Sequence, residues 1–492
     1  MRRLQSSNEP SETPRRFALT GCVTAAVYCL LVVVYHFGAE SLAHFSREFI
    51  AWFVVLSLMA LYGYGWRLAR TSPAISLRLV VTFGLMFGLV CVAIAPFHST
   101  DLYSYINRGW EQTHYHLNPY VRTVSSIPNW ERDRMFATAW VDNPCPYGFL
   151  FALIARSLAW LGNGNPLVTS FLFKTLDLAC FAGIGWLLFA AGKELRLDRL
   201  DLPLYLFLWN PLVLLHEIAN GHNDLLVALF LMIAIYFIVT ERMVFVIPAL
   251  ICGALIKPPL AITVPFALVL VLRSADIRET LTSLGLALIA IAATAAPYIA
   301  DLRNFPLAVM ADNLLSTTGS LKSVFDDLLK AIAETLPALH LPIPNLSAAF
   351  GAVIWLSFAG FFFLQLIRFA ENNGYLVKRF LAVTVLMQFV LIAVASSKTY
   401  PWYINMFLPA ALLLRLPNWL TRLVVVVSCT ELLGFTFLGQ AHFLNYLDLI
   451  ALPTILVAAL NWPAVYAAIV GKWSRSLEEH EPLSERTIAA VA

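Results

Sequence analysis

Residues 79–97 read LVVTFGLMFGLVCVAIAPF, a run without a charged side chain, and Asp101 follows shortly after it. About 18 or more consecutive apolar residues are needed to span the hydrocarbon core of a bilayer. Comparable runs recur from end to end of the 492-residue chain, which is 60% hydrophobic and 13% charged. A soluble domain carries about 25% charged residues, so the composition predicts an all-α polytopic membrane protein.

The apolar runs predict about 14 transmembrane helices by this length criterion. The run from 243 to 272 is read as one broken helix or as two, because Lys257-Pro258-Pro259 interrupts it and proline removes a backbone donor. Residues 147–161 are also apolar, but they are few and include Arg156, so we expect an interfacial or re-entrant segment there. The predicted spans are 17–37, 48–68, 76–97, 166–191, 201–216, 223–240, 243–256, 259–272, 281–299, 348–367, 378–396, 402–416, 421–440 and 446–470.

The distribution of Lys and Arg predicts the orientation of these spans, because cytoplasmic loops are enriched in both residues. With the N-terminus inside, the inner segments hold basic residues such as Arg70, Lys193, Arg278 and Arg379. Counting 147–161 as a span would move Lys193 and every later basic loop to the outside. We therefore expect a cytoplasmic N-terminal tail (1–16), one transmembrane domain (17–470) and a cytoplasmic C-terminal tail (471–492), in the inner (plasma) membrane.

Several classes of protein find no support in the sequence. No basic stripe interleaved with aromatic residues indicates a nucleic-acid partner. The cysteines fall mostly within apolar runs, which does not suggest a disulfide framework. Gly192-Lys193 lacks the remaining residues of a nucleotide-binding P-loop, and no Cys and His cluster suggests haem or an iron–sulfur group.

Two long outer loops, 98–165 and 300–347, are the expected place for chemistry, because functional residues concentrate on loops held by a scaffold. The first begins His98-Ser99-Thr100-Asp101 and continues through Tyr103, Tyr105 and Asn118-Pro119-Tyr120. Turn-forming and aromatic residues at this density predict a folded site and not a tether. An isolated carboxylate at a helix end is otherwise an ordinary solvated residue. In the second loop, 324–329 could start an amphipathic helix on the membrane surface.

A second polar cluster runs from His216 to Asp224 at a predicted outer boundary and includes His222 and Asn223. Three interpretations stay open: hydrogen bonding to a polar substrate, a metal site, or a structural polar cap. The spacing matches no zinc motif, including the helical His-Glu-x-x-His pattern. A divalent cation is therefore compatible with these residues, but no motif supports it, and no cofactor is predicted with certainty.

Cations form a third set of candidates. Lys257 lies within an apolar run, where a charged side chain usually faces a cavity or a partner, although snorkelling to the interface is the alternative. Lys398 and Trp402 lie in the segment Ser396–Tyr403 at an outer interface, where aromatic anchors are expected in any membrane protein. Arg303 lies in the second outer loop.

Together these segments resemble the polyprenol-phosphate-mannose-dependent mannosyltransferases of the bacterial envelope, members of the GT-C glycosyltransferase superfamily. The resemblance extends in order along residues 98–403. Its motifs are Asp101-Leu102-Tyr103-Ser104-Tyr105, Asn118-Pro119-Tyr120, Pro146-Tyr147-Gly148, Leu208-Trp209-Asn210-Pro211, Gly221-His222-Asn223-Asp224, Lys257-Pro258-Pro259 and Pro401-Trp402-Tyr403.

The resemblance implies a GT-C-like bundle with two long extracytoplasmic loops that carry interfacial helices, and an extracytoplasmic active site. It implies an inverting hexosyltransferase that moves a sugar, mannose above others, from a polyprenyl-phosphate carrier to a glycan or glycolipid acceptor. Asp101 occupies the position of the catalytic carboxylate, although Thr100 stands where many relatives carry a second acidic residue. The substrate-binding residues implied are Tyr103, Tyr105, Asn118, Tyr147, His222, Asn223, Asp224, Lys257, Arg303, Lys398 and Trp402.

The residues fit the needs of that reaction. A carboxylate such as Asp101 can accept the proton of an attacking hydroxyl, and fixed cations can stabilise a departing lipid phosphate. The main alternative is a transporter or flippase of lipid-linked sugars, which should place ionisable groups near the bilayer midplane. Lys174 and Asp177 fit that alternative, because they lie three residues apart and could pair on one helix face. A non-catalytic scaffold of envelope assembly is a third interpretation.

Overall fold

The computed structural model is all-helical wherever it describes the chain. The described residues are 12–37, 44–72, 75–304, 317–371, 374, 376–415, 418–438 and 446–470. Within them the one extended pairing is an isolated parallel bridge between Thr318 and Lys398. The predicted C-terminal tail, most of the N-terminal tail and residues 305–316 of the second outer loop lie outside the described residues.

Within the described residues, six helices are long and apolar enough to cross a membrane, or up to seven if one bent pair is a single span. The bent pair is α7 (Asp201–Leu208) followed by the π-helical turn Val213–Ala219, and the two are inclined by 53°. The long helices are α1 (Glu12–Val32), α2 (His44–Thr71), α6 (Pro166–Glu194), α11 (Ile277–Ala295), α14 (Ile343–Glu371) and α15 (Leu376–Val390), which continues through the π-helical turn Leu391–Ala395.

The remaining predicted spans also correspond to helices, most of which are shorter or divided. Proline explains part of this, since Pro258-Pro259 interrupts the run 243–272 and forms a 3₁₀ helix, Pro258–Thr263. The count of 14 spans therefore stays a prediction. The elements are α3 (Leu77–Ala93), α8 (Asp224–Val239), α9 (Val246–Ala254), α10 (Val264–Ser274), α16 (Leu408–Leu412), α17 (Trp419–Leu438), α19 (Leu452–Leu460) and α20 (Trp462–Val470).

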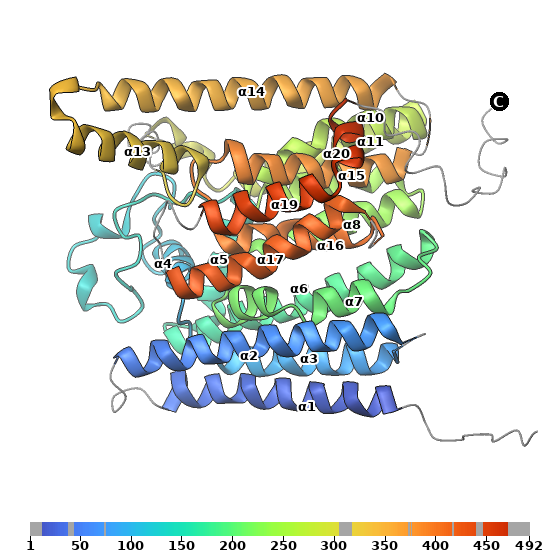
Figure 1. The fold of residues 1–492 in the computed structure, drawn as a ribbon. Helices are drawn as coiled ribbons and strands as arrows, with labels where there is room; N and C mark the ends of the chain where they lie inside the picture. The colour runs from blue at the N-terminus through green and yellow to red at the C-terminus, as the bar shows by residue number, and fades with distance from the viewer. Residues whose placement is uncertain are drawn as a thin grey trace, which may run out of the picture.

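The two long loops gather at one end of the bundle (Figure 1). There α4 (Asp101–Thr113) and the loop after it lie at the left of the view, with α13 (Leu321–Thr335) above them. The expected helix around 324–329 is present as α13, whose Ser320 and Ser323 form a reciprocal capping box. Both loops thus carry helices, although their relation to a membrane surface is a prediction.

Residues 147–161 form α5 (Phe149–Gly162), which packs along α4 and against α6. The contact is close because Gly109 has no side chain: a Cβ there would lie 2.3 Å from the Ala155 carbonyl oxygen. Asn165 then caps α6 by accepting hydrogen bonds from the backbone N–H groups of Leu167 and Val168.

Lys174 and Asp177 of α6 form no ion pair among those of the described residues, although the spacing would allow one. Both side chains are buried, and the Lys174 ammonium donates to the carbonyl oxygen of Ile94. That carbonyl closes the C-terminal end of α3, where helix carbonyls lack intrahelical donors. The lysine therefore caps a neighbouring helix, a contact between residues far apart in sequence that spacing along α6 could not indicate.

Candidate active site

Asp101 is the first residue of α4, and the chain that leads to it is held by Asn220. The Asn220 Oδ1 atom accepts hydrogen bonds from the backbone N–H groups of Phe97 (2.9 Å) and His98 (3.0 Å). Ser99 Oγ then accepts from the Asp101 N–H at 3.1 Å. The turn after α7 therefore fixes where α4 begins and where its first carboxylate lies.

Gly221 allows that turn to pass beneath α4. Its φ is +73°, a left-handed conformation that glycine adopts without strain, and a Cβ would come within 3.0 Å of the Leu102 side chain. The next residue, His222, consequently lies directly beside Asp101. A substitution at Gly221 would be opposed by both the backbone conformation and the limited space.

Asp101 and His222 meet at the centre of the site. Their Oδ2 and Nδ1 atoms are 3.5 Å apart, and the Asp101 side chain keeps 18% exposure whereas that of His222 has none. The His222 ring stacks on Trp402, with centroids 3.8 Å apart, and Trp402 also stacks on Tyr400 at 4.7 Å. The aromatic stack fixes the plane of the imidazole that faces the carboxylate.

The charge state of Asp101 follows from these neighbours. Burial acts to raise the pKa of Asp101, but the adjacent His222 ring and the positive charge of Lys257 together lower it below the ordinary value. A smaller contribution comes from the nearby Trp140 side chain. The carboxylate is therefore held ionised while it remains partly open to solvent.

A buried ion pair lies close to this centre. Lys257 Nζ is 2.7 Å from Asp224 Oδ1, and it also lies 4.0 Å above the ring of Tyr403. Lys257 comes just before the proline break, and the segment at Gly148 docks on that break through its N–H group, which donates to the Ile256 carbonyl oxygen at 3.0 Å. The first outer loop thereby holds the lysine in place.

Further buried polar groups surround the pair. Glu217 accepts from Asn405 Nδ2 at 2.6 Å and from the backbone N–H of Leu225 at 3.2 Å. The Asn223 amide is 1% exposed, and neither its oxygen nor its nitrogen has a hydrogen-bond partner among the described residues. Buried polar groups are normally satisfied, so an unsatisfied amide at this place needs an explanation.

The predicted aromatic and amide residues of the first loop occupy different settings. Tyr105 is 1% exposed and packs edge-to-face on Tyr147 at 5.2 Å, so it supports its neighbour more than it offers a free surface. Asn118 donates to the Tyr298 carbonyl oxygen at 3.1 Å and tethers this loop to the start of the second loop. Tyr103 is half-buried on α4. Their role towards a substrate stays a prediction.

Arg303 and Lys398 lie on different segments. Arg303 is exposed on the 3₁₀ helix Ile299–Asn304, and within the described part of the chain it has no ion-pair partner. Lys398 lies in the segment that pairs with Thr318 and leads into Tyr400 and Trp402. Its ammonium has no ion-pair partner among the described residues, and partial burial lowers the pKa of Lys398.

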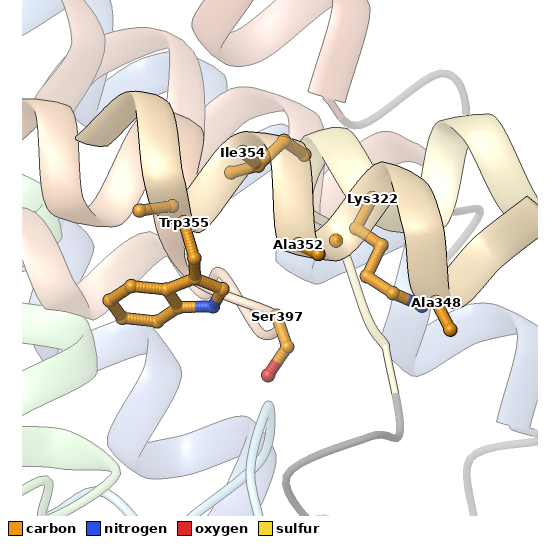
Figure 2. A pocket seen from close by; sticks show the side chains of 8 residues that line it. Lys322, Ala348, Ala352, Ile354, Trp355 and Ser397 are labelled. Carbon is orange, nitrogen blue, oxygen red and sulfur yellow. The ribbon is translucent and has the colours of Figure 1, made fainter. Parts of the chain in front are cut away.

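A cleft of about 220 Å³ opens between α13, α14 and the segment of Lys398. Its walls are mainly apolar, with the Lys322 side chain and Ser397 supplying polar groups (Figure 2). The Lys322 ammonium is bound to Asp326 at 2.9 Å and to Ser347 at 2.6 Å. The residues that line the cleft are Lys322, Ala348, Gly351, Ala352, Ile354, Trp355, Ala395 and Ser397.

Sequence reasoning placed several of these residues in one site but missed others. The structure brings Asp101, His222, Asp224, Lys257 and Trp402 together. Aromatic residues are common at any membrane interface, which is why Trp140, Tyr400 and Tyr403 gave no distinctive signal. No group of three or more His, Cys, Asp or Glu side chains is placed to hold a metal ion within the described part of the chain.

Comparisons with known proteins relate the chain to a family of glycosyltransferases. A family model described as "Alpha-(1->6)-mannopyranosyltransferase, N-terminal domain" matches residues 19–273, which is more than half of the chain. A Corynebacterium glutamicum protein named alpha-(1->6)-mannopyranosyltransferase B is 25% identical over 168 residues, covering 34% of this chain and 27% of that protein. A Mycobacterium tuberculosis protein named alpha-(1->6)-mannopyranosyltransferase A is 27% identical over 214 residues, covering 43% and 40%. The matched regions therefore cover less than half of the length of either relative.

Proposed function

The chain belongs to the alpha-(1->6)-mannopyranosyltransferase family, and on that premise we propose that it is an inverting mannosyltransferase with Asp101 as its general base. The donor is a polyprenyl-phosphate mannose, and the acceptor is a glycan or glycolipid on the extracytoplasmic face of the plasma membrane. The observation that carries the proposal is the pairing of the partly exposed Asp101 carboxylate with the buried His222 ring at 3.5 Å.

In the proposed reaction, Asp101 accepts a proton while the mannose moves from the lipid phosphate to the acceptor. The acceptor hydroxyl oxygen attacks C1 of the mannose, and its proton passes to the Asp101 carboxylate. The bond between C1 and the phosphate oxygen breaks, and its electron pair leaves with the polyprenyl phosphate. Attack opposite the leaving group inverts the anomeric centre. The lowered pKa of Asp101 supports this role, because the carboxylate is in the proton-accepting form at neutral pH.

Positive charge near the leaving phosphate stabilises the charge that develops on it. Lys257 lies close to Asp101, but its bond to Asp224 balances much of its charge. Lys398 has no such partner among the described residues, so we assign it the larger part of this role. The isoprenoid tail then fits the apolar cleft between α13 and α14, where Ser397 adjoins Lys398 (Figure 2).

Transfer from labelled polyprenyl-phosphate mannose to oligomannoside acceptors, measured with purified protein in liposomes, tests the proposal. The Asp101→Asn variant removes the base and leaves the shape of the side chain, so the rate should fall by about 10²- to 10⁴-fold. Glu131→Gln is the matched control, since Glu131 is an exposed carboxylate of the same loop, and its rate should stay at the native level.

Each other result has a definite meaning. Full activity in Asp101→Asn, with folding intact by thermal denaturation, would remove Asp101 as the base but keep the class of enzyme. Labelled donor that crosses the bilayer without any transfer would instead support the flippase alternative. If protein that binds the donor shows neither sugar transfer nor passage of the donor across the bilayer, the proposal is rejected.

A further inference from the structure

Trp140 is an aromatic residue of the first outer loop that sequence reasoning passed over. Its side chain is 44% exposed, and its φ is +56°. A bulky residue other than glycine rarely adopts this left-handed backbone. Such conformations cost about 1–3 kcal/mol and persist where the surroundings over-determine them, often at ligand-binding sites.

Two buried side chains of α4 hold the loop in this conformation. Arg108, which is 1% exposed, donates through Nη2 to the Trp140 carbonyl oxygen at 2.8 Å and to the Asn143 carbonyl oxygen. Its Nη1 group pairs with Glu111 at 3.2 Å. The backbone around Trp140 is therefore fixed by a buried charge that has no contact with solvent.

Asn107 holds the other side of the same turn. It is fully buried, and its Nδ2 group donates to the carbonyl oxygens of Ala137 (2.8 Å) and Ala139 (3.2 Å). Its Oδ1 atom accepts from the Ala137 N–H at 3.0 Å. Asn107 and Arg108 belong to the helix that Asp101 begins, so the base and the Trp140 loop form one rigid unit.

The Trp140 side chain lies near the base. It is close enough to the Asp101 carboxyl group to contribute to the lowered pKa of that group, while nearly half of the residue's surface stays exposed. A tryptophan that served as a membrane anchor would need neither a strained backbone nor a contact with a carboxylate. An exposed apolar ring fixed beside a catalytic carboxylate instead suits a ligand with an apolar face and hydroxyl groups.

We propose that Trp140 is the platform on which the terminal pyranose of the glycan acceptor packs, and that this contact presents the acceptor hydroxyl to Asp101. The proposal rests on the function proposed above. A pyranose ring has a face of C–H groups that packs on an aromatic ring and a rim of hydroxyl groups that hydrogen-bond. The indole offers both a broad apolar surface and an N–H donor.

The acceptor, and not the donor sugar, is the expected occupant. A general base must lie within hydrogen-bond reach of the proton that it removes, and that proton is on the acceptor. The donor sugar is tethered to the lipid phosphate, whose expected cations are Lys257 and Lys398. Trp140 lies on the loop side of Asp101, in the segment clamped by α4.

Kinetics of the native protein and three variants in liposomes test the assignment, with the oligomannoside acceptor varied at saturating donor. Trp140→Gly removes the ring but accepts positive φ without strain, so the fold should be kept while KM for the acceptor rises about tenfold or more. Trp140→Phe keeps an aromatic face and should stay within about threefold of native. KM for the donor should change little in either variant.

Trp160→Ala is the matched control, because Trp160 is 71% exposed on α5. The residue before it, Ala159, lies against Gly109 of α4. Gly109 is eight residues after Asp101, about 12 Å along the helix, so Trp160 lies away from the base. This variant should behave as native. An acceptor KM that is unchanged in a folded Trp140→Gly variant would overturn the proposal, as would an equal loss in Trp160→Ala.

A binding measurement separates this proposal from the proposed function. Saturation-transfer NMR with the oligomannoside reports binding without turnover. Mannoside binding that depends on Trp140 without any sugar transfer would keep the platform and reject the transferase. Sugar transfer that is unchanged in Trp140→Gly would keep the transferase and reject the platform. The absence of both mannoside binding and sugar transfer would reject both proposals.

Discussion

His222 shows how strongly one side chain can depend on its surroundings. The ring is fully buried, it stacks on Trp402 at 3.8 Å, and its Nδ1 atom faces Asp101. The stack leaves the imidazole little freedom to rotate. We therefore propose that His222 orients the Asp101 carboxylate and, by its position 3.5 Å from the charged form, helps to keep that carboxylate ionised.

A pH profile tests this role. Because His222 lowers the pKa of Asp101, the His222→Gln variant should show a raised pKa and an acid limb of kcat/KM that lies at higher pH than in the native protein. A carboxyl base is active when deprotonated, so the variant should lose activity first as the pH falls. At pH values above the acid limb, we expect a smaller loss of kcat/KM in the His222→Gln variant.

His114→Gln is a suitable comparison, since His114 is an exposed histidine at the end of α4, the helix that Asp101 begins. Its acid limb should coincide with the native one. A His222→Gln profile with an unmoved acid limb would contradict the electrostatic role of His222, even if the overall rate were lower.

The central residues were predictable by two different routes. Lys257 lies within an apolar run, where a charged side chain usually has a partner or faces a cavity. Asp101 and His222 became candidates because they lie in motifs that resemble those of a known family. The partners were not predictable in the same way. Nothing in the local sequence indicates that Lys257 bonds to Asp224 or that Trp402 stacks on His222.

At the scale of elements, the packing of α4 on α5 positions the site. Asp101 begins α4, and the buried Gln112 near its end donates to the Ala152 carbonyl oxygen of α5 at 3.1 Å. Gly109 lies between these points, against Ala155 and Ala159. Because α4 and α5 approach each other so closely, the two helices together hold Asp101 in place, although a long loop separates them in the sequence.

The Gly109→Ala variant tests the importance of that contact. The added methyl group would lie 2.3 Å from the Ala155 carbonyl oxygen and 2.7 Å from the Ala159 Cβ, so the helices must move apart. Overpacking of this kind costs about 1–3 kcal/mol. We expect a lower midpoint of thermal unfolding in detergent and a reduced rate of transfer.

Gly285→Ala provides the control within another helix. Gly285 lies in α11, and a Cβ there meets nothing within 4 Å. Alanine favours helix over glycine by about 1 kcal/mol, so this variant should be as stable as native or more stable. Equal stability of the two variants would show that the α4–α5 contact is not tight.

For the whole molecule, the basic residues predict one orientation across the membrane. The described part of the chain contains six or up to seven helices that qualify as spans by length and composition. The distribution of Lys and Arg predicts that the loop after α4 is extracytoplasmic and that the segment after α6 is cytoplasmic. The bundle collects α4, its loop and α13 at one end (Figure 1), as an active site on one face requires.

Cysteine labelling in intact cells tests the orientation. A membrane-impermeant maleimide should label Glu131→Cys directly, whereas Lys193→Cys should be labelled after permeabilisation, since both positions are exposed on the protein. The unsubstituted protein, with its seven cysteines, gives the background. The reverse pattern would place the site in the cytoplasm and exclude the proposed lipid-linked donor.

The sequence alone determined the class of fold, the segments that become helices and the central residue types. Those properties are local: whether about 20 residues prefer hydrocarbon is decided by those residues themselves, and a charge within such a run is costly whatever the rest of the fold. Only the tertiary structure decided that Lys174 caps α3, that the run 201–216 bends and that Trp140 reaches Asp101. Each of these depends on contacts between residues distant in sequence, and close packing sets such contacts jointly for the whole bundle.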